Sequence, residues 1–242
     1  MPEGDLVVAL LYPEVLGSYG DGGNATALVH RGAARGLDVR VVEVGLGTTA
    51  PAADVYLLGG GEDSAQLLAL EAARRDPHLT TTLADGATCL AVCAGLQLLC
   101  GEFTGPDGRV HAGLGLLDAT SGRLAERAVG EVVADPVGLP GLPPLSGYEN
   151  HLGTAVPGPD ARPLGRVRAG TGNGPGPDGV RHEGVVRGGI VATYLHGPVL
   201  VRNPALADLL LERTTGPLPA YDDALVEQLR TERLAAARRR RG

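Results

Sequence analysis

Cys93 is the residue in this sequence that is best placed to act as a nucleophile. It stands between an apolar run at residues 89–92 and a helical pattern that begins at Ala94, with the small residues Ala91 and Gly95 on either side. Small residues at these positions allow the tight strand-to-helix turn that holds a nucleophile above the carboxyl end of a sheet. We therefore predict that Cys93 is catalytic; the alternative is a small buried thiol that only packs.

A cysteine nucleophile needs a neighbouring base, and we predict that His196 supplies it. Lowering a thiol pKa from about 8.5 to about 6.5 takes roughly 2.7 kcal/mol, whereas a helix N-terminus provides at most about 2 kcal/mol. His196 follows the apolar run 190–195 and precedes Gly197 and Pro198, so a strand would bring it to the same sheet edge as Cys93. His151 is our second choice, and the alternative for His196 is a histidine buried at the end of a core strand. The histidines without a chemical signal around them are His30, His78, His111 and His182.

Backbone N–H groups at two turns could hold the oxyanion that forms during acyl transfer. Residues 59–61 are glycines that follow the apolar run 55–58, and Ala94 opens the helical pattern after Cys93. We predict that the N–H groups of Gly60 and Ala94 form this oxyanion site, although three glycines are also an ordinary way to turn a chain. The glycine-rich residues 17–23 lack the Gly-Lys-Ser/Thr ending of a phosphate loop, so we expect them to shape the mouth of the site.

The composition excludes several other chemistries. The 242 residues include no lysine, which rules out a Schiff base with a cofactor and a lysine-bearing phosphate loop. A net charge of -7 argues against nucleic acid as a partner, despite four consecutive arginines at 238–241. Three clustered cysteines without a Cys-x-x-Cys pair favour reduced thiols over disulfides or zinc. We expect packing roles for Cys89 and Cys100, and no metal or other cofactor.

The order of apolar segments predicts an α/β fold. Strand-like runs at residues 6–11, 39–44, 55–58 and 89–92 alternate with helical patterns at 24–34, where Asn24 is the expected N-cap, and at 64–75. This alternation favours a mostly parallel central sheet flanked by helices on both faces. Further strands are expected at 131–134 and 188–195, with surface loops near the site at 157–184.

The C-terminal part is expected to be helical. Asn203 and Pro204 form a start signal for a helix over 205–213, and a final helix over about 221–240 carries Leu225, Leu229 and Leu234 for packing on the domain or on a partner. We predict one catalytic domain at residues 1–216 and a C-terminal helical extension at 217–242. The sequence shows no basic leader before the apolar run 6–11 and no run of membrane-spanning length, so we expect a cytoplasmic protein that does not span a membrane.

Taken together, these residues resemble the class I glutamine amidotransferases, and among them the branch typified by cobyric acid synthase. The motifs that carry the resemblance are Cys93-Ala94-Gly95-Leu96-Gln97, Tyr194-Leu195-His196-Gly197 and Gly147-Tyr148-Glu149-Asn150-His151. The resemblance spans about residues 6–213 and implies the α/β fold of that family. It also implies L-glutamine as substrate and a substrate-binding role for Gln97.

The sequence is similar, more closely still, to the glutaminase subunits of lipid II isoglutaminyl synthases. Residues 19–24, 59–63, 127–130 and 194–198 carry this likeness. It implies that Arg127 binds the α-carboxylate of glutamine, a role suited to the forked guanidinium; the alternative is a surface arginine on a strand edge. It also implies a heterodimer, in which ammonia passes to a Mur-ligase-like, ATP-dependent subunit that amidates the D-glutamate of lipid II during peptidoglycan synthesis.

Pro198 departs from the family pattern, because many class I members have a glutamate two residues after the histidine. That acid fixes the tautomer of the imidazole. Its absence leaves three alternatives: a Cys–His dyad, an acid from elsewhere such as Glu149, or an acid from the partner. We hypothesise the partner, because this would couple hydrolysis to complex formation. Two other functions stay open: a stand-alone Cys–His hydrolase of the same fold, and a catalytically silent interaction module.

Overall fold

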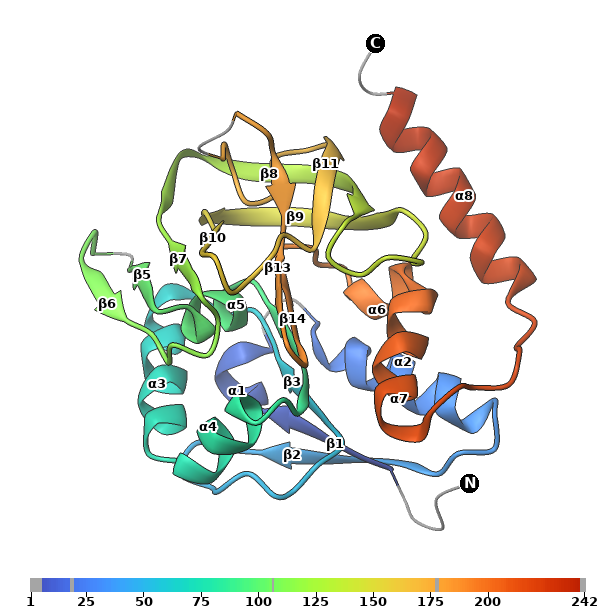
Figure 1. The fold of residues 1–242 in the computed structure, drawn as a ribbon, viewed down its shortest axis with the longest axis horizontal. Helices are drawn as coiled ribbons and strands as arrows, with labels where there is room; N and C mark the ends of the chain where they lie inside the picture. Colours follow the sequence, from blue (N-terminus) through green and yellow to red (C-terminus); the bar gives the residue numbers. More distant parts are fainter. Residues whose placement is uncertain (1–5, 18–19, 106, 177–178, 240–242) are drawn as a thin grey trace.

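The central element is a six-stranded sheet, which confirms the predicted α/β architecture (Figure 1). The computed structural model describes residues 6–17, 20–105, 107–176 and 179–239. The strand order is β13-β14-β4-β3-β1-β2, and every neighbouring pair is parallel except β13 with β14. Its strands are β1 (Leu6–Leu11), β2 (Val39–Val44), β3 (Val55–Leu58), β4 (Thr88–Val92), β13 (Val185–Arg187) and β14 (Ile190–Thr193).

Helices cover both faces of this sheet, so its inner strands are apolar along their whole length. All residues of β3, β4 and β14 are buried, as expected for strands covered on two sides. The helices α2 (Gly22–Ala33), α6 (Val199–Arg202) and α7 (Pro204–Thr215) pack together on one side. The other side carries α1 (Pro13–Leu16), α3 (Asp63–Arg74), α4 (Pro77–Ala84) and α5 (Ala94–Leu99) (Figure 1).

The predicted helix caps are only partly right. Helix α2 begins one turn earlier than expected, with Asp21 at the N-cap position. Asn24 therefore lies inside the helix, where its Oδ1 accepts a hydrogen bond from the Leu200 N–H at 3.0 Å and ties α2 to α6. Asn203 does stand before α7, but its side chain makes no cap bond within that helix. Its amide instead bonds the backbone N–H and carbonyl of Ser146 at 2.8 Å each.

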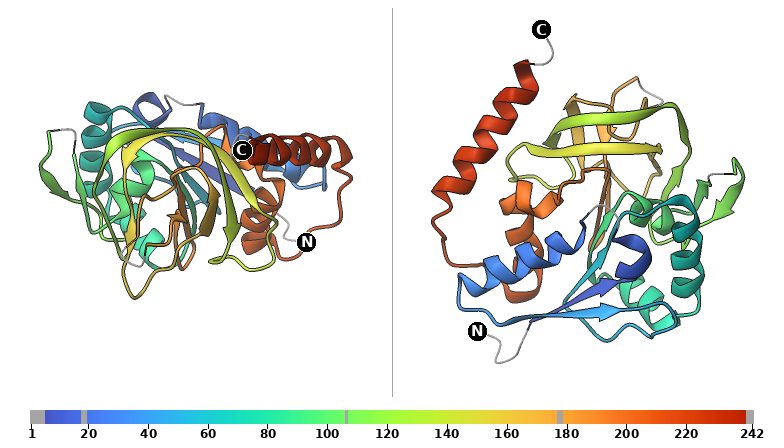
Figure 2. Two further views of the ribbon diagram at one scale, coloured as in Figure 1. Left: turned by 90° about the horizontal axis from the view of Figure 1, so that it is seen from above. Right: turned by 180° about the vertical axis from the view of Figure 1, so that it is seen from behind.

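Two small sheets are built from segments that follow α5 and lie over one end of the central sheet (Figures 1 and 2). One has the order β12-β11-β8-β9 and is antiparallel. Its strands are β8 (Arg123–Pro136), β9 (Leu145–Gly153), β11 (Gly165–Ala169) and β12 (His182–Glu183). The other has the order β10-β7-β5-β6, with β5 (Glu102–Thr104), β6 (Val110–Ala112), β7 (Ala119–Ser121) and β10 (Val156–Pro157).

The prediction of surface loops over residues 157–184 was therefore wrong in part. This segment contributes β11 and β12 to the antiparallel sheet. Both strands are short, and glycine and proline surround them, so the period-2 pattern of a strand is too brief to stand out. At one such glycine, Gly184, φ is +61° and a Cβ would lie 2.4 Å from the Ala192 carbonyl oxygen. A tight passage past β14 requires glycine there.

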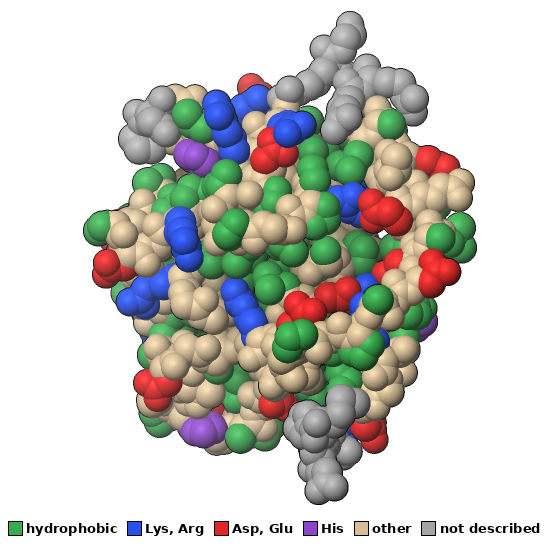
Figure 3. Space-filling model, turned by 45° about the vertical axis from the view of Figure 1, so that its right-hand side comes forward, with side chains coloured by type: hydrophobic (Ala, Val, Ile, Leu, Met, Phe, Trp, Pro, Cys, Tyr) green, Lys and Arg blue, Asp and Glu red, His purple; other side chains and the backbone are tan. Residues whose placement is uncertain are grey.

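The C-terminal helix α8 (Ala224–Arg239) packs on the antiparallel sheet through a small cluster of its own. Leu234 and Ala237 contact the cluster residues Val133 and Ala169. Leu225 and Leu229 do not pack on the domain, because 70% and 49% of their surfaces are exposed, and their packing on a partner stays a prediction. On the face that carries α8, basic and acidic side chains are interspersed among hydrophobic ones (Figure 3).

The structure tests only some of the expectations about the chain's ends, its loops and its domain division. Arg240 and Arg241 of the basic end lie outside the described residues, as do Ser18 and Tyr19 of the glycine-rich loop. Within the described part of the chain, no helix is both long and apolar enough to cross a bilayer. The division into a domain at 1–216 and an extension at 217–242 stays a prediction.

Candidate active site

Cys93 occupies the predicted strand-to-helix turn, in a strained backbone conformation. It follows β4 directly and precedes Ala94, the first residue of α5, with φ 54° and ψ −105°. Among the described residues, Tyr12 is the only other non-glycine residue with positive φ. Such a conformation costs of order 1–3 kcal/mol and persists where the surroundings enforce it. The Cys93 N–H donates to the Thr193 carbonyl at 2.8 Å, which fixes the turn to the end of β14.

Gly95 is needed because α5 approaches the end of β3 very closely. A Cβ at this position would lie 2.9 Å from both the Cβ and the carbonyl oxygen of Leu58. The Gly95 N–H donates to the Gly59 carbonyl at 3.2 Å. The small residue that the sequence placed beside Cys93 thus lets the helix begin directly above the sheet.

The other two cysteines have the packing roles that we predicted. Cys89 and Cys100 are fully buried free thiols. Burial raises the pKa of each to about 12, so neither forms a thiolate near neutral pH. Of the three cysteines, Cys93 is the one that lines the pocket described next, and its catalytic role stays a prediction.

A polar pocket opens beside Cys93 and carries two arginines. Arg127 is exposed, and its Nη1 donates to Asn150 Oδ1 at 3.1 Å. Arg123 lies four residues earlier on the same strand, β8, and also lines the pocket; the sequence reasoning missed it. Period-2 alternation from Arg127 could not have found it, because the register of β8 shifts between Arg123 and Ala128. Polar side chains around the pocket include Cys93, Gln97, Arg123, Arg127, Asn150 and His151.

Gln97 forms part of the pocket wall. Its Oε1 accepts a hydrogen bond from Gln66 Nε2 at 2.8 Å, and its Nε2 donates to Ser121 Oγ at 3.3 Å. These bonds tie α5 to α3 and to β7. Its predicted contact with the substrate stays a prediction.

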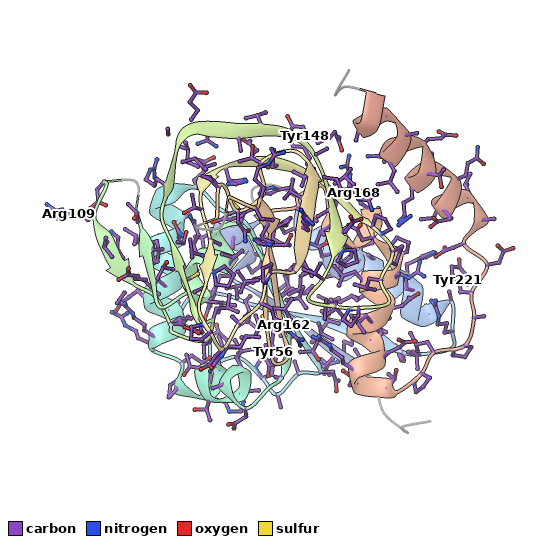
Figure 4. All side chains as sticks on the ribbon, turned by 45° about the horizontal axis from the view of Figure 1, so that its top comes forward. Tyr56, Arg109, Tyr148, Arg162, Arg168 and Tyr221 are labelled. Atoms are coloured by element: carbon purple, nitrogen blue, oxygen red, sulfur yellow. The ribbon has the colours of Figure 1, made fainter. Side chains whose placement is uncertain are left out.

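His196 follows β14 and is held by strand β9. It is 4% exposed, and its backbone N–H and carbonyl bond the carbonyl and N–H of Tyr148 at 2.8 and 3.1 Å. The ring Nδ1 lies 3.0 Å from the same Tyr148 carbonyl oxygen. A carbonyl only accepts, so Nδ1 carries the proton and Nε2 is the nitrogen that can act as a base. The Tyr148 side chain itself points outward from the sheet (Figure 4).

Burial keeps the His196 imidazole neutral. Desolvation lowers its pKa, with His151 acting in the same direction, while the Tyr148 carbonyl and Glu149 oppose the shift. A neutral imidazole is the form that accepts a proton from a thiol. Among the described residues that line the pocket, His151 is present and His196 is not.

The alternative acid, Glu149, contacts His151 rather than the Nδ1 of His196. Glu149 is 2% exposed, and its Oε2 lies 3.6 Å from His151 Nε2. The carboxylate accepts the backbone N–H groups of Thr171 and Gly172 at 2.8 and 2.9 Å. The orienting partner of His196 within this chain is thus the Tyr148 carbonyl.

The Gly60 N–H is already bonded in this structure. It donates to Asp21 Oδ2 at 2.7 Å, and Gly61 rather than Gly60 lines the pocket. Burial raises the pKa of Asp21 to about 6, although this hydrogen bond lowers it. An oxyanion role for Gly60 stays a prediction that requires this bond to open. Ala94 lies as predicted, at the first position of α5.

Comparison with known proteins identifies the family. Residues 7–204 match the CobB/CobQ-like glutamine amidotransferase domain. The chain belongs to this family. It is therefore a glutamine amidotransferase, as the residues around Cys93 indicated, and the resemblance to the cobyric acid synthase branch is confirmed.

Two relatives span nearly the whole of this amidotransferase. Both are named lipid II isoglutaminyl synthase (glutamine-hydrolyzing) subunit GatD. The protein from Staphylococcus aureus is 34% identical over 86% of this chain and 84% of its own length. The protein from Streptococcus pneumoniae is 30% identical over 94% of this chain and 90% of its own length. A cobyric acid synthase from Sphingopyxis alaskensis is 31% identical over 74% of this chain but only 35% of its own length.

Solved structures agree on the fold of this amidotransferase. A glutamine amidotransferase crystal structure superposes with a TM-score of 0.56 at 21% identity, covering 86% of this chain and 98% of its own. The glutaminase domain of a Trypanosoma brucei protein gives a TM-score of 0.54 at 10% identity, covering 90% of this chain and 96% of its own. These identities are low, so the likeness supports the fold alone.

Proposed function

We propose that this chain is the glutaminase subunit of a lipid II isoglutaminyl synthase. It hydrolyses L-glutamine to glutamate and ammonia, and the ammonia passes to a Mur-ligase-like, ATP-dependent partner that amidates the D-glutamate of lipid II. The observation that carries this proposal is Cys93, strained at the end of β4 in a pocket with Arg127. The names of the two GatD relatives support the acceptor.

The proposed reaction gives each of these groups one role. The Cys93 thiol gives its proton to His196 Nε2 as its sulfur attacks the side-chain amide carbon of glutamine. The Ala94 N–H at the start of α5 points at the oxyanion, and Arg127 pairs with the α-carboxylate. His196 then protonates the departing nitrogen, and ammonia leaves. A water, deprotonated by His196, cleaves the thioester and releases glutamate.

The partner supplies the acid that stands beside histidine in other class I members. This part of the proposal is supported by Pro198 at the position of the family's glutamate and by the Tyr148 carbonyl at His196 Nδ1. A carbonyl fixes the tautomer but carries no full charge to stabilise an imidazolium. We expect slow glutamine hydrolysis by the isolated chain and faster hydrolysis with the ligase. Equal, high rates in both states would contradict this step.

Labelling with 6-diazo-5-oxo-L-norleucine, an electrophilic glutamine analogue, tests whether the chain is a glutaminase with Cys93 as its nucleophile. We expect the full chain in complex with its genomic-neighbour ligase to be labelled once, at Cys93, and the Cys93→Ala variant to stay unlabelled. Cys100→Ser is the matched control, because this thiol is buried and its pKa is about 12. A complex that is neither labelled nor active on glutamine would favour the silent interaction module.

Amidation assays separate the remaining alternatives. With lipid II, ATP and glutamine, the complex should form isoglutaminyl lipid II, and Cys93→Ala should do so only when ammonium is supplied. A stand-alone hydrolase would instead cleave small amides that lack an α-carboxylate as fast as glutamine. Such indifference to the carboxylate would overturn the role of Arg127.

A further inference from the structure

A second imidazole, paired with a buried carboxylate, lies in the Cys93 pocket and has no role in the mechanism above. His151 is 3% exposed and lines the pocket. Its ring stacks on the ring of Tyr194, with centroids 4.0 Å apart and planes 10° from parallel. Tyr194 follows Thr193, the residue whose carbonyl holds the Cys93 N–H. His151 is therefore fixed next to the nucleophile by the same strand end that fixes Cys93.

Both ring nitrogens of His151 face oxygen acceptors. Its Nδ1 lies 2.9 Å from the Gly153 carbonyl oxygen, so Nδ1 carries a proton. Its Nε2 faces Glu149 Oε2 at 3.6 Å and has no hydrogen-bond partner among the described residues. An unprotonated Nε2 would direct a lone pair at this carboxylate, whereas an N–H⁺ is attracted to it. Two backbone N–H groups, from Thr171 and Gly172, donate hydrogen bonds to the Glu149 carboxyl group and fix its position.

We propose that Glu149 and His151 form an acid–imidazole pair whose protonated ring stabilises the Cys93 thiolate. The inference rests on the proposed glutaminase function and adds two residues to it. His151 moves no proton: it stays charged while His196 accepts the thiol proton and returns it to the leaving nitrogen. Glu149 is a positioning residue, because it acts on the thiolate only by holding the charge and orientation of His151.

In this proposal, His196 transfers the proton and His151 supplies the positive charge. A helix N-terminus alone leaves part of the thiolate stabilisation unexplained, and a fixed cation in the pocket supplies it. A protonated His151 also lowers the pKa of His196, which keeps the base neutral. Pushing two titratable groups toward opposite charge states is how neighbouring acid and base roles are separated.

Other charged or titratable groups face this site from each packed element. Arg123 and Arg127 of β8 favour a thiolate as well, but guanidinium groups stay charged at every relevant pH. The remaining groups are Glu62 before α3, Tyr194 and His196 after β14, and Glu183 of β12. Of these, Tyr194 is not ionised near neutral pH, because burial raises its pKa further.

The pH dependence of Cys93 alkylation tests the pair. The full chain is treated with iodoacetamide between pH 5 and 10, and tandem mass spectrometry separates Cys93 from the two buried cysteines. We expect His151→Gln and Glu149→Gln each to raise the midpoint pH by about one unit, so alkylation below the midpoint slows about tenfold. His182→Gln, on β12 away from the pocket, should leave the midpoint unchanged.

Several outcomes would overturn the proposal. An unchanged midpoint in His151→Gln would show that His151 does not stabilise the thiolate. A shift in His151→Gln without a shift in Glu149→Gln would show that Glu149 has no positioning role. If His151→Gln does not fold, Glu149→Gln decides the question, because it keeps the ring and its stacking. Alkylation needs neither glutamine nor a partner, so a shifted midpoint in a chain that never hydrolyses glutamine would refute the proposed function and leave the pair intact.

Discussion

Glu183 makes the stability of this chain depend on pH in a way that one substitution should remove. Its side chain is fully buried on β12; Oε1 accepts the Thr193 hydroxyl and, at 2.9 Å, the Tyr194 N–H. Desolvation raises its pKa from 4.5 to about 7, against the lowering by these hydrogen bonds. The carboxyl therefore holds the strand end that precedes His196 while keeping its proton at unusually high pH.

The sign and size of the effect follow from proton linkage. In the unfolded chain the carboxyl ionises near pH 4.5, whereas in the folded chain it keeps its proton until about pH 7. Stability from this group is therefore present at low pH and lost as the pH rises through that window. A shift of about 2.5 units corresponds to roughly 3 kcal/mol of unfolding free energy. Glu183→Gln cannot titrate, so it removes this loss.

Urea unfolding of both proteins between pH 4.5 and 8.5, followed by circular dichroism, measures the effect. At each pH, the unfolding free energy of the parent is subtracted from that of Glu183→Gln. This difference should increase by about 3 kcal/mol as the pH rises from 4.5 to 8.5. Any constant cost of the buried amide group cancels in that change. The surface variant Glu43→Gln, on β2, should show no comparable trend. A difference for Glu183→Gln that stays within about 0.5 kcal/mol at all pH values would refute the reasoning.

Three further predictions follow from the packing around the site. Gly95→Ala should destabilise the chain by roughly 1–3 kcal/mol and slow Cys93 labelling, because its Cβ overlaps Leu58; unfolding and labelling rates measure both. Arg127→Lys should raise the KM for glutamine about tenfold or more with little change in kcat, since one charge-assisted fork is lost; steady-state kinetics check this. Leu234→Ala should cost about 2–4 kcal/mol in urea unfolding, whereas Leu225→Ala, at a 70% exposed site, should stay within about 0.5 kcal/mol.

Four strands of the central sheet could be predicted from the sequence almost to the residue. Strands β1, β2 and β3 have the predicted bounds, and β4 begins only one residue earlier, at Thr88. Strands that are buried between two helical layers leave continuous apolar runs bounded by turn residues. The strands of the antiparallel sheet have no such continuous apolar runs in the sequence. Strand β8 was predicted only over its buried part at 131–134, because residues 123–127 alternate weakly and a register shift follows them.

The candidate site shows the same limit. Cys93 stood out because the turn that strains it requires small neighbours in sequence, and local constraints leave local signals. The pairing of Glu149 with His151 gave no such signal. It depends on backbone N–H groups of residues 171 and 172, more than twenty positions away. Arg123 was missed for a related reason, since its side chain reaches the pocket only through the long strand that sequence reasoning shortened.

Strand β9 explains why the chemistry needs both kinds of sheet. Its residues alternate in burial: Glu149 and His151 are buried, whereas Asn150 between them is only partly buried and holds Arg127 at the pocket. The same strand's backbone carbonyl at Tyr148 orients His196, at the end of the central sheet. A slip of one residue would exchange these two sets of side chains and move the carboxylate and the second imidazole out of their buried positions. Under the proposed mechanism, the activation of Cys93 therefore depends on the register of an antiparallel sheet as well as on the nucleophile turn.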